Sequence, residues 1–369
     1  MMRHGLWMFS LALACNGSSG GASATDTSTS TETTSTSTET TSAETTTGLT
    51  TTGLTTTEAP TTTTMTTTTG PTTGEATTTM TTSTTTTGAV DPPMSLEDVV
   101  DGELEVIADG HMFTEGPIWS PEGFLLYSDI PANTIFRWAE GEQPSAFITP
   151  SGNSNGLAFD AMGRLLAAEH GNRQISRRVI GEAAETVVGE YEGKQLNSPN
   201  DLTIRSDGTI YFTDPPYGIQ PNQQELAFQG VFRIDPQGQI WLIADDFERP
   251  NGIVLSPDES LLYVADTATE QVRVFDVAAD GDAVGGAVFV DLTSDLVGDP
   301  DGMAVDVFGD IFVTGGGGIR VVTPAGVVLG TIAVPESATN CKFGDDDGMA
   351  LYITAPPRVY RIRLKVQGA

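Results

Sequence analysis

The sequence predicts an all-β protein, a six-bladed β-propeller, and three observations support this. A phrase of two apolar strands joined by a turn occurs six times, at intervals of 39 to 51 residues. The turns within these phrases contain Pro, Asp and Gly, which fix φ or tolerate positive φ. Further short apolar strands follow each phrase. A repeat of about four short strands at this period is typical of a propeller blade.

Each of the six phrases opens on an acidic or amide residue. The phrases read EGPIWSPEGFLLYSD, NGLAFDAMGRLLAAEH, NDLTIRSDGTIYFTD, NGIVLSPDESLLYVAD, DGMAVDVFGDIFVTG and NCKFGDDDGMALYIT. Their opening residues are Glu115, Asn155, Asn200, Asn251, Asp301 and Asn340. Because each phrase is strand, turn and strand, we expect each to form a hairpin that begins a blade.

A third strand follows each hairpin, and a fourth usually follows the third. The third strands are expected at residues 134–138, 174–179, 230–234, 271–275, 319–322 and 358–364. The last blade has no fourth strand of its own, whereas residues 104–108 form an unassigned apolar strand ahead of the first blade. We expect this N-terminal strand to close the last blade, because pairing the two ends of the chain removes open sheet edges.

The region before the propeller has two parts. Residues 1–15 contain a basic start and a short apolar run that ends at Cys15, which is typical of a lipoprotein signal peptide; an ordinary signal peptide is the alternative. Residues 16–92 are rich in Thr and Ser and have too few apolar groups to offset the entropy of ordering. We therefore expect a disordered linker there, the propeller at 93–369, and an exported protein held at the cell envelope by lipid on Cys15.

Charge and cysteine content exclude several other roles. The chain has 49 acidic and 17 basic residues, a formal net charge of −32, which disfavours a nucleic-acid partner. Apart from the signal, no apolar run approaches the roughly eighteen residues of a membrane span, so the lipid anchor is the expected membrane contact. With Cys15 lipidated, no cysteine remains to pair with Cys341, which we expect to be a buried, inert thiol.

The six opening residues predict a site. The first strands of the blades lie nearest the central channel and run in the same direction, so these residues should meet at one end of the axis. Two carboxylates, Glu115 and Asp301, together with amide carbonyls form the hard oxygen set that calcium prefers. Without a cation, one carboxylate is expected to take up a proton. Strand capping is the structural alternative, since Asn-Gly and Asp-Gly are common turn pairs.

The phrases resemble the senescence-marker-protein, gluconolactonase and luciferin-regenerating-enzyme family of six-bladed propellers. The resemblance covers about residues 96–365, and its SPND and DPPYG forms resemble the bacterial gluconolactonase branch. Its most specific segments are FTEGPIW, AAEHGNR, KQLNSPNDLTIRSDGTIYFTDPPYG, ERPNGIVLSPDE and PDGMAVD.

The resemblance implies one divalent cation, usually calcium, with magnesium, zinc and manganese as alternatives. Its ligands would be Glu115, Asn200, Asn251 and Asp301. The positions of Asn155, Asn340 and Asp214 would support these ligands without being primary ones. Relatives that act on free sugar lactones carry an Arg where this chain has Ser198, a departure that leaves the substrate open.

The expected chemistry is calcium-assisted hydrolysis of a lactone, whose carbonyl oxygen gains negative charge as water attacks. Asp301 is the expected general base, and Asn200 would steady the substrate or the oxyanion. Further candidate substrate contacts are His170, Asn200, Ser198, Tyr217 and Arg249. His170 could instead order the neighbouring loop, and the loop at 215–229 could be a lid or a fixed rim.

Two other functions fit the same sequence. The propeller could be a non-enzymatic interaction module displayed at the cell surface, in which a cation only closes the channel. It could also hydrolyse another ester or a phosphoester, because related propellers share ligands and vary the rim. An open coordination position facing an accessible pocket would favour catalysis over the interaction module.

Overall fold

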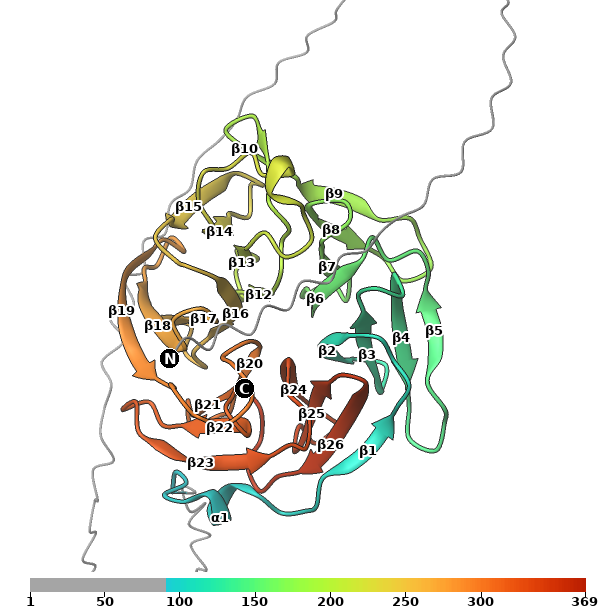
Figure 1. The fold of residues 1–369 in the computed structure, drawn as a ribbon, viewed down its shortest axis with the longest axis vertical. Coiled ribbons are helices and arrows are strands. Elements are labelled where there is room, and N and C mark those ends of the chain that lie inside the picture. The colour runs from blue at the N-terminus through green and yellow to red at the C-terminus, as the bar shows by residue number, and fades with distance from the viewer. Residues whose placement is uncertain (1–90) are drawn as a thin grey trace, which may run out of the picture. The chain divides into compact units, whose positions relative to one another are not determined.

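The computed structural model describes residues 91–369 and confirms a six-bladed β-propeller (Figure 1). Six antiparallel sheets of four strands surround a central channel, and their first strands, β2, β6, β12, β16, β20 and β24, lie innermost. The predicted signal peptide at 1–15 and nearly all of the predicted linker at 16–92 lie outside the described residues. Within residues 91–369, no helix has the length and apolar character needed to cross a membrane.

The blades follow one another in chain order. Blade one contains β2 (Thr114–Ser120), β3 (Phe124–Asp129), β4 (Thr134–Trp138) and β5 (Ser145–Ile148), and blade two contains β6 (Ser154–Phe159), β7 (Leu165–Glu169), β8 (Gln174–Arg178) and β9 (Glu185–Val188). Blade three contains β12 (Leu202–Ile204), β13 (Ile210–Asp214), β14 (Gly230–Ile234) and β15 (Ile240–Ala244), and blade four contains β16 (Pro250–Leu255), β17 (Leu261–Asp266), β18 (Gln271–Val277) and β19 (Ala283–Asp291). Blade five contains β20 (Met303–Val305), β21 (Ile311–Gly315), β22 (Gly318–Val322) and β23 (Val328–Ala333).

The sixth blade closes the ring as the sequence predicted. Its strands are β24 (Asn340–Gly344), β25 (Ala350–Ala355), β26 (Arg358–Arg363) and, from the N-terminal side, β1 (Glu105–Ala108). β1 pairs antiparallel with β26, with Glu105 opposite Arg361. The helix α1 (Leu96–Val99) precedes β1 and packs against β23 of blade five. The two ends of the propeller are thus joined within one sheet, which leaves no open edge between the first and last blades.

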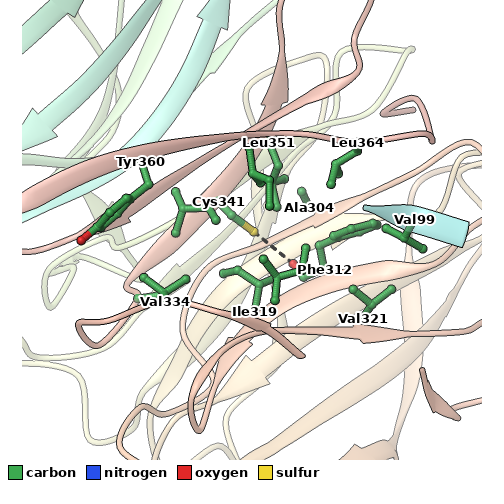
Figure 2. Close-up of a cluster of buried hydrophobic side chains, with 14 of the residues drawn as sticks. Val99, Ala304, Phe312, Ile319, Val321, Val334, Cys341, Leu351, Tyr360 and Leu364 are labelled. Atoms are coloured by element: carbon green, nitrogen blue, oxygen red, sulfur yellow. Dashed lines mark hydrogen bonds between the residues drawn. The ribbon is translucent and has the colours of Figure 1, made fainter. Parts of the chain in front are cut away.

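Apolar side chains pack between neighbouring blades. The second strands are buried on both faces, as in β13 and β25, whereas outer strands such as β5 contain only exposed or partly buried residues. Figure 2 shows the cluster between blades five and six, where Cys341 lies among Phe312, Leu351 and other apolar side chains. The Cys341 thiol donates to the Phe312 carbonyl at 3.2 Å, and burial raises its pKa to about 12. The thiol is therefore buried and unreactive, as expected.

Three elements were not predicted, one of which is the helix α1 described above. A two-stranded hairpin, β10 (Glu190–Tyr191) and β11 (Lys194–Gln195), lies between blades two and three, and a short 3-10 helix, η1 (Pro221–Gln223), lies within the loop at 215–229. Both lie in connections outside the repeated phrases, so the repeat carries no information about them.

Candidate functional site

The six opening residues of the phrases lie at one end of the channel. Three are the second residues of β2, β6 and β16, one begins β24, and the remaining two, Asn200 and Asp301, lie two residues before β12 and β20. Five of them are almost fully buried, with 2–5% of their surface exposed, while Asp301 is partly exposed. Because all six inner strands run in the same direction, the repeat places six polar residues in one ring.

Bulges in three inner strands aim these residues at the channel. The strand register shifts just after Glu115 in β2, after Ser154 in β6 and after Pro250 in β16. A bulge inserts an extra residue and redirects the side chain beside it. The side chains of Glu115, Asn155 and Asn251 therefore leave the regular alternation of the strand at the place where the blades converge.

Glycines after the ring residues allow neighbouring blades to approach closely. Gly116 has a φ of +49°, and a Cβ there would lie 2.0 Å from the carbonyl oxygen of Asn155 in the next blade. A Cβ on Gly252 would likewise lie 2.0 Å from the Asp301 carbonyl oxygen, which accepts a hydrogen bond from the Gly252 N–H at 3.0 Å. Gly is required at both positions because the backbones of neighbouring blades are in contact there. This contact keeps the six ring residues close together.

The amide side chains of the ring form a hydrogen-bonded chain across three blades. Asn155 Nδ2 donates to Asn200 Oδ1 at 2.6 Å, and Asn200 Nδ2 donates to Asn251 Oδ1. Asn251 Nδ2 in turn lies 3.0 Å from Thr267 Oγ1. His170 Nε2 also donates to Asn200 Oδ1, at 3.1 Å. Asn200 thus lies in contact with both of its neighbours in the ring and with His170.

Three carboxyl groups share the channel, and their pKa values are raised. Burial raises the pKa of Glu115 to about 8, and repulsion from Asp201 adds to the effect. The pKa of Asp301 is raised well above its usual value, first by loss of hydration and then by repulsion from Glu115. Burial raises the pKa of Asp201 to about 6. Without a cation these carboxyl groups are partly protonated at neutral pH, as the sequence led us to expect.

Asp201 was missed by the sequence analysis. Its Oδ2 accepts a hydrogen bond from Asn340 Nδ2 at 3.4 Å, which links it to the opposite side of the ring. A usable signal was present, because four of the six phrases have Gly in their second position and the third phrase has Asp201. A carboxylate in place of a glycine on an inner strand indicates that the channel holds a third acidic group.

The donor set fits a hard divalent cation. Asn155 Oδ1 is buried and, among residues 91–369, has no hydrogen-bond partner. A buried oxygen without a partner is expected where the protein binds a further group, such as a metal ion. Asn251 Oδ1 accepts one hydrogen bond and keeps a second lone pair, whereas Asn200 Oδ1 accepts two. Ligation by Asn200 therefore requires Asn155 or His170 to release one hydrogen bond. Residues 91–369 contain no cluster of three or more His, Cys, Asp or Glu in metal-binding geometry, so amide oxygens must complete any ligand set.

His170 does not titrate near neutral pH. Burial lowers its pKa to about 4, although its hydrogen bond with Asn200 partly opposes this. The imidazole is neutral at pH 7 and acts as a hydrogen-bond donor to the ring. Asp214, at the end of β13, accepts a hydrogen bond from the Asn197 N–H at 2.7 Å, and burial raises its pKa to about 7.

Ser198 and Tyr217 define the rim beside the ring. Ser198 is fully buried; its hydroxyl donates to the Pro215 carbonyl at 2.7 Å and accepts from the Gly218 N–H at 2.8 Å. Both hydrogen bonds hold the start of the loop at 215–229, so Ser198 influences the site by positioning this loop. Tyr217 lies in this loop, and its hydroxyl lies 3.4 Å from Asn251 Nδ2. The hydrogen bonds favour a fixed rim over a lid.

Arg249 completes the rim on the side of blade four. Its guanidinium carbon lies 5.0 Å from the centre of the Tyr217 ring. Its backbone is held from both sides, because the Arg249 N–H donates to Asp266 Oδ1 at 2.9 Å and its carbonyl accepts from the Thr267 N–H at 3.0 Å. The structure thus brings Tyr217, Arg249 and Asn251 together.

The fold and the ring define a class of protein: a six-bladed β-propeller with a buried, oxygen-rich site at one end of its channel. A family model described as the SMP-30/Gluconolactonase/LRE-like region matches residues 113–356, which include all six ring residues. The chain belongs to this family.

Several relatives cover most of the chain. It is 36% identical over 297 residues to a gluconolactonase from Zymomonas mobilis, covering 73% of this chain and 83% of the relative. The solved structure of a gluconolactonase from Xanthomonas campestris is 35% identical, covers 74% of this chain and 95% of its own, and superposes with a TM-score of 0.68. A regucalcin from Xenopus laevis is 25% identical over 256 residues, covering 68% of this chain and 85% of the relative.

Proposed function

We propose that this protein hydrolyses a lactone at the oxygen-rich end of its channel, with the aid of a divalent cation. Gluconolactonase relatives that match almost three quarters of the chain indicate a lactone-hydrolysing enzyme. The observation that carries the proposal is that Asp301 lies within electrostatic reach of Glu115, at the end of the channel where the amide chain of Asn155, Asn200 and Asn251 also lies.

Glu115, Asn200, Asn251 and Asp301 are the proposed ligands. Calcium suits them because they offer only oxygen donors; magnesium, zinc and manganese are the alternatives. A bound cation would neutralise the carboxylates, polarise the lactone carbonyl and lower the pKa of a bound water. Asn155 Oδ1, which lacks a partner within residues 91–369, is available as an additional oxygen.

Asp301 is the proposed general base. Its carboxylate takes a proton from the attacking water as the water oxygen bonds to the carbonyl carbon, and the ring ester C–O bond then breaks with protonation of the leaving oxygen. Asn251 lies near Asp301 and opposes the rise in the pKa of its carboxyl group. Asn200, between Asn155 and Asn251, would steady the substrate carbonyl.

The test compares Asp301→Asn with Asp299→Asn on a panel of sugar, aliphatic and aromatic lactones. Asp299 lies two residues away and its pKa is also raised by burial, so it is a matched acidic control. We expect Asp301→Asn to fold and to lose about 10²- to 10⁴-fold in kcat, with Asp299→Asn much less affected. Full activity of Asp301→Asn would remove Asp301 from the mechanism.

Two other functions remain as outcomes of this test. Turnover of aryl esters or phosphoesters without turnover of any lactone would assign a different hydrolase. No turnover of any substrate with calcium restored would favour a surface-displayed interaction module.

We also propose that the protein is exported and anchored at the cell envelope by lipid on Cys15. This rests on the short apolar run that ends at Cys15. Mass spectrometry of the N-terminal peptide tests it: a diacylglyceryl group on Cys15 is expected, and an unmodified thiol would contradict it.

A further inference from the structure

We propose that Arg249 binds an anionic group of the substrate, so that the preferred lactone carries a carboxylate or a phosphate. This inference rests on the proposed lactone hydrolysis and names the substrate class of the same site. It is carried by one guanidinium group at the rim that the protein itself leaves without a hydrogen-bond acceptor.

Arg249 differs from the other arginines of the propeller. In a chain with 49 acidic and 17 basic residues, most arginines of residues 91–369 are ion-paired, as Arg273 is with Asp246 at 2.9 Å. Within the same residues, Arg249 has no ion pair, and its guanidinium has no hydrogen bond; its Nε atom is buried without a partner. Arg320 also lacks an ion pair there, but it donates to Thr331 Oγ1 at 3.1 Å.

The unpaired guanidinium is held in position. It lies over the ring of Tyr217, and the Tyr217 hydroxyl contacts Asn251 in the amide chain. Hydrogen bonds with Asp266 and Thr267 fix the backbone of Arg249, and Ser198 fixes the loop that carries Tyr217. Because the backbones that carry both side chains are anchored, less conformational entropy is lost when a ligand binds than at a mobile surface loop.

The chemistry of this arrangement selects an anion. Stacking on an aromatic ring occupies a face of the guanidinium and leaves its N–H edge free. That edge matches two oxygens of a carboxylate or phosphate, and such charge-assisted pairs are about twice as strong as neutral hydrogen bonds. Asp301 and Arg249 both lie near Tyr217 and shift the pKa of its hydroxyl in opposite directions, yet among residues 91–369 they form no ion pair with each other. A substrate anion would supply the missing acceptor while the lactone carbonyl faces the ring.

The experiment measures kcat/KM for three lactones that share a carbon skeleton and differ at C6: glucono-lactone, which is neutral, glucaro-lactone, which carries a 6-carboxylate, and 6-phosphoglucono-lactone. The variants are Arg249→Gln, Arg249→Lys and the control Arg320→Gln. We expect the wild type to prefer one of the two anionic lactones, which identifies the anion. Arg249→Gln should lower the ratio of anionic to neutral kcat/KM by about 10- to 100-fold. Arg249→Lys should be intermediate, and Arg320→Gln should leave the ratio unchanged.

Two outcomes would overturn the inference: a wild type without preference for either anionic lactone, or an Arg249→Gln variant that retains the wild-type ratio. Calorimetric binding of glucitol, a neutral polyol, and of gluconate, the carboxylate of the same carbon skeleton, separates this failure from failure of the proposed function. If no lactone is turned over but gluconate binds more tightly than glucitol and Arg249→Gln abolishes the difference, the anion site stands without the hydrolase. Equal binding of glucitol and gluconate would refute the anion site as well.

Discussion

At the scale of single residues, the ring depends on glycine where two backbones meet. We predict that Gly116→Ala lowers the free energy of unfolding, because φ is +49° and the new Cβ would meet the Asn155 carbonyl oxygen at 2.0 Å. Backbone strain alone costs about 1–3 kcal/mol, and the contact adds to it. Gly163→Ala is the matched control, since its φ is +73° and a Cβ there meets nothing within 4 Å.

Chemical denaturation of both variants measures the difference. Gly116→Ala should be the less stable by more than about 1 kcal/mol. Equal destabilisation of the two variants would mean that the blades can move apart at no cost, and that the ring is less constrained than we describe.

Glu115 gives the metal-free protein a distinctive pH dependence. Its pKa rises from 4.5 to about 8 on folding, so the folded state holds a proton that the unfolded state has lost. Stability from this group is fully present below pH 4.5 and is lost as pH rises towards 8, by about 1.4 kcal/mol per pH unit. His170, lowered to about 4, acts in the opposite sense, but only below pH 6.5.

The window from pH 6.5 to 8 therefore isolates the carboxyl groups. In chelated protein we predict that the free energy of unfolding falls across this window, and that Glu115→Gln reduces the slope. A slope remains in the variant, because Asp214 and Asp306 have pKa values raised to about 7. The same slope in wild type and Glu115→Gln would show that Glu115 does not hold a proton in the fold.

The ring residues could be identified from the sequence, whereas the contacts that they make could not. Six polar residues at one position of a repeat must converge in a propeller, so the ring could be predicted before the structure. Asp201 stands at the glycine position of its phrase, so the pattern that identified the ring passed over it. The partners of Ser198 and Arg249 lie in a loop whose path depends on packing rather than on the repeat.

At the scale of elements, the strands of the blades were predictable because the apolar residues that the blades bury recur in each of the six phrases. The expected third strand at 134–138 matches β4, and the expected closing strand at 104–108 matches β1 to within one residue. The hairpin of β10 and β11 was not predictable, since a two-residue strand carries no alternation to detect.

The rim loop gives a prediction at this scale. Ser198→Ala removes the acceptor of the Gly218 N–H and the donor to the Pro215 carbonyl. We expect faster amide hydrogen exchange in residues 216–219 and a loss of about 1–2 kcal/mol in stability. Ser206→Ala, in an exposed turn, is the control and should leave this exchange unchanged. Unchanged exchange in Ser198→Ala would show that other contacts fix the rim.

At the scale of the whole molecule, closure of the ring and the site depend on each other. β1 and β26 join the chain ends in one sheet, and this closure holds Glu115 of blade one beside Asn340 of blade six. The amide chain joins blades two, three and four. A cation bound at the ring would therefore contact residues from several blades and stabilise the whole propeller through its preference for the folded state.

The proposed role of the ring is tested most directly by measuring lactone turnover with one protein preparation that is first chelated and then titrated with calcium. We predict that chelation abolishes turnover and that calcium restores it, saturating at one ion per chain, while Glu115→Gln requires more calcium for the same rate. Full turnover by the chelated wild-type protein would contradict the proposed role of the ring.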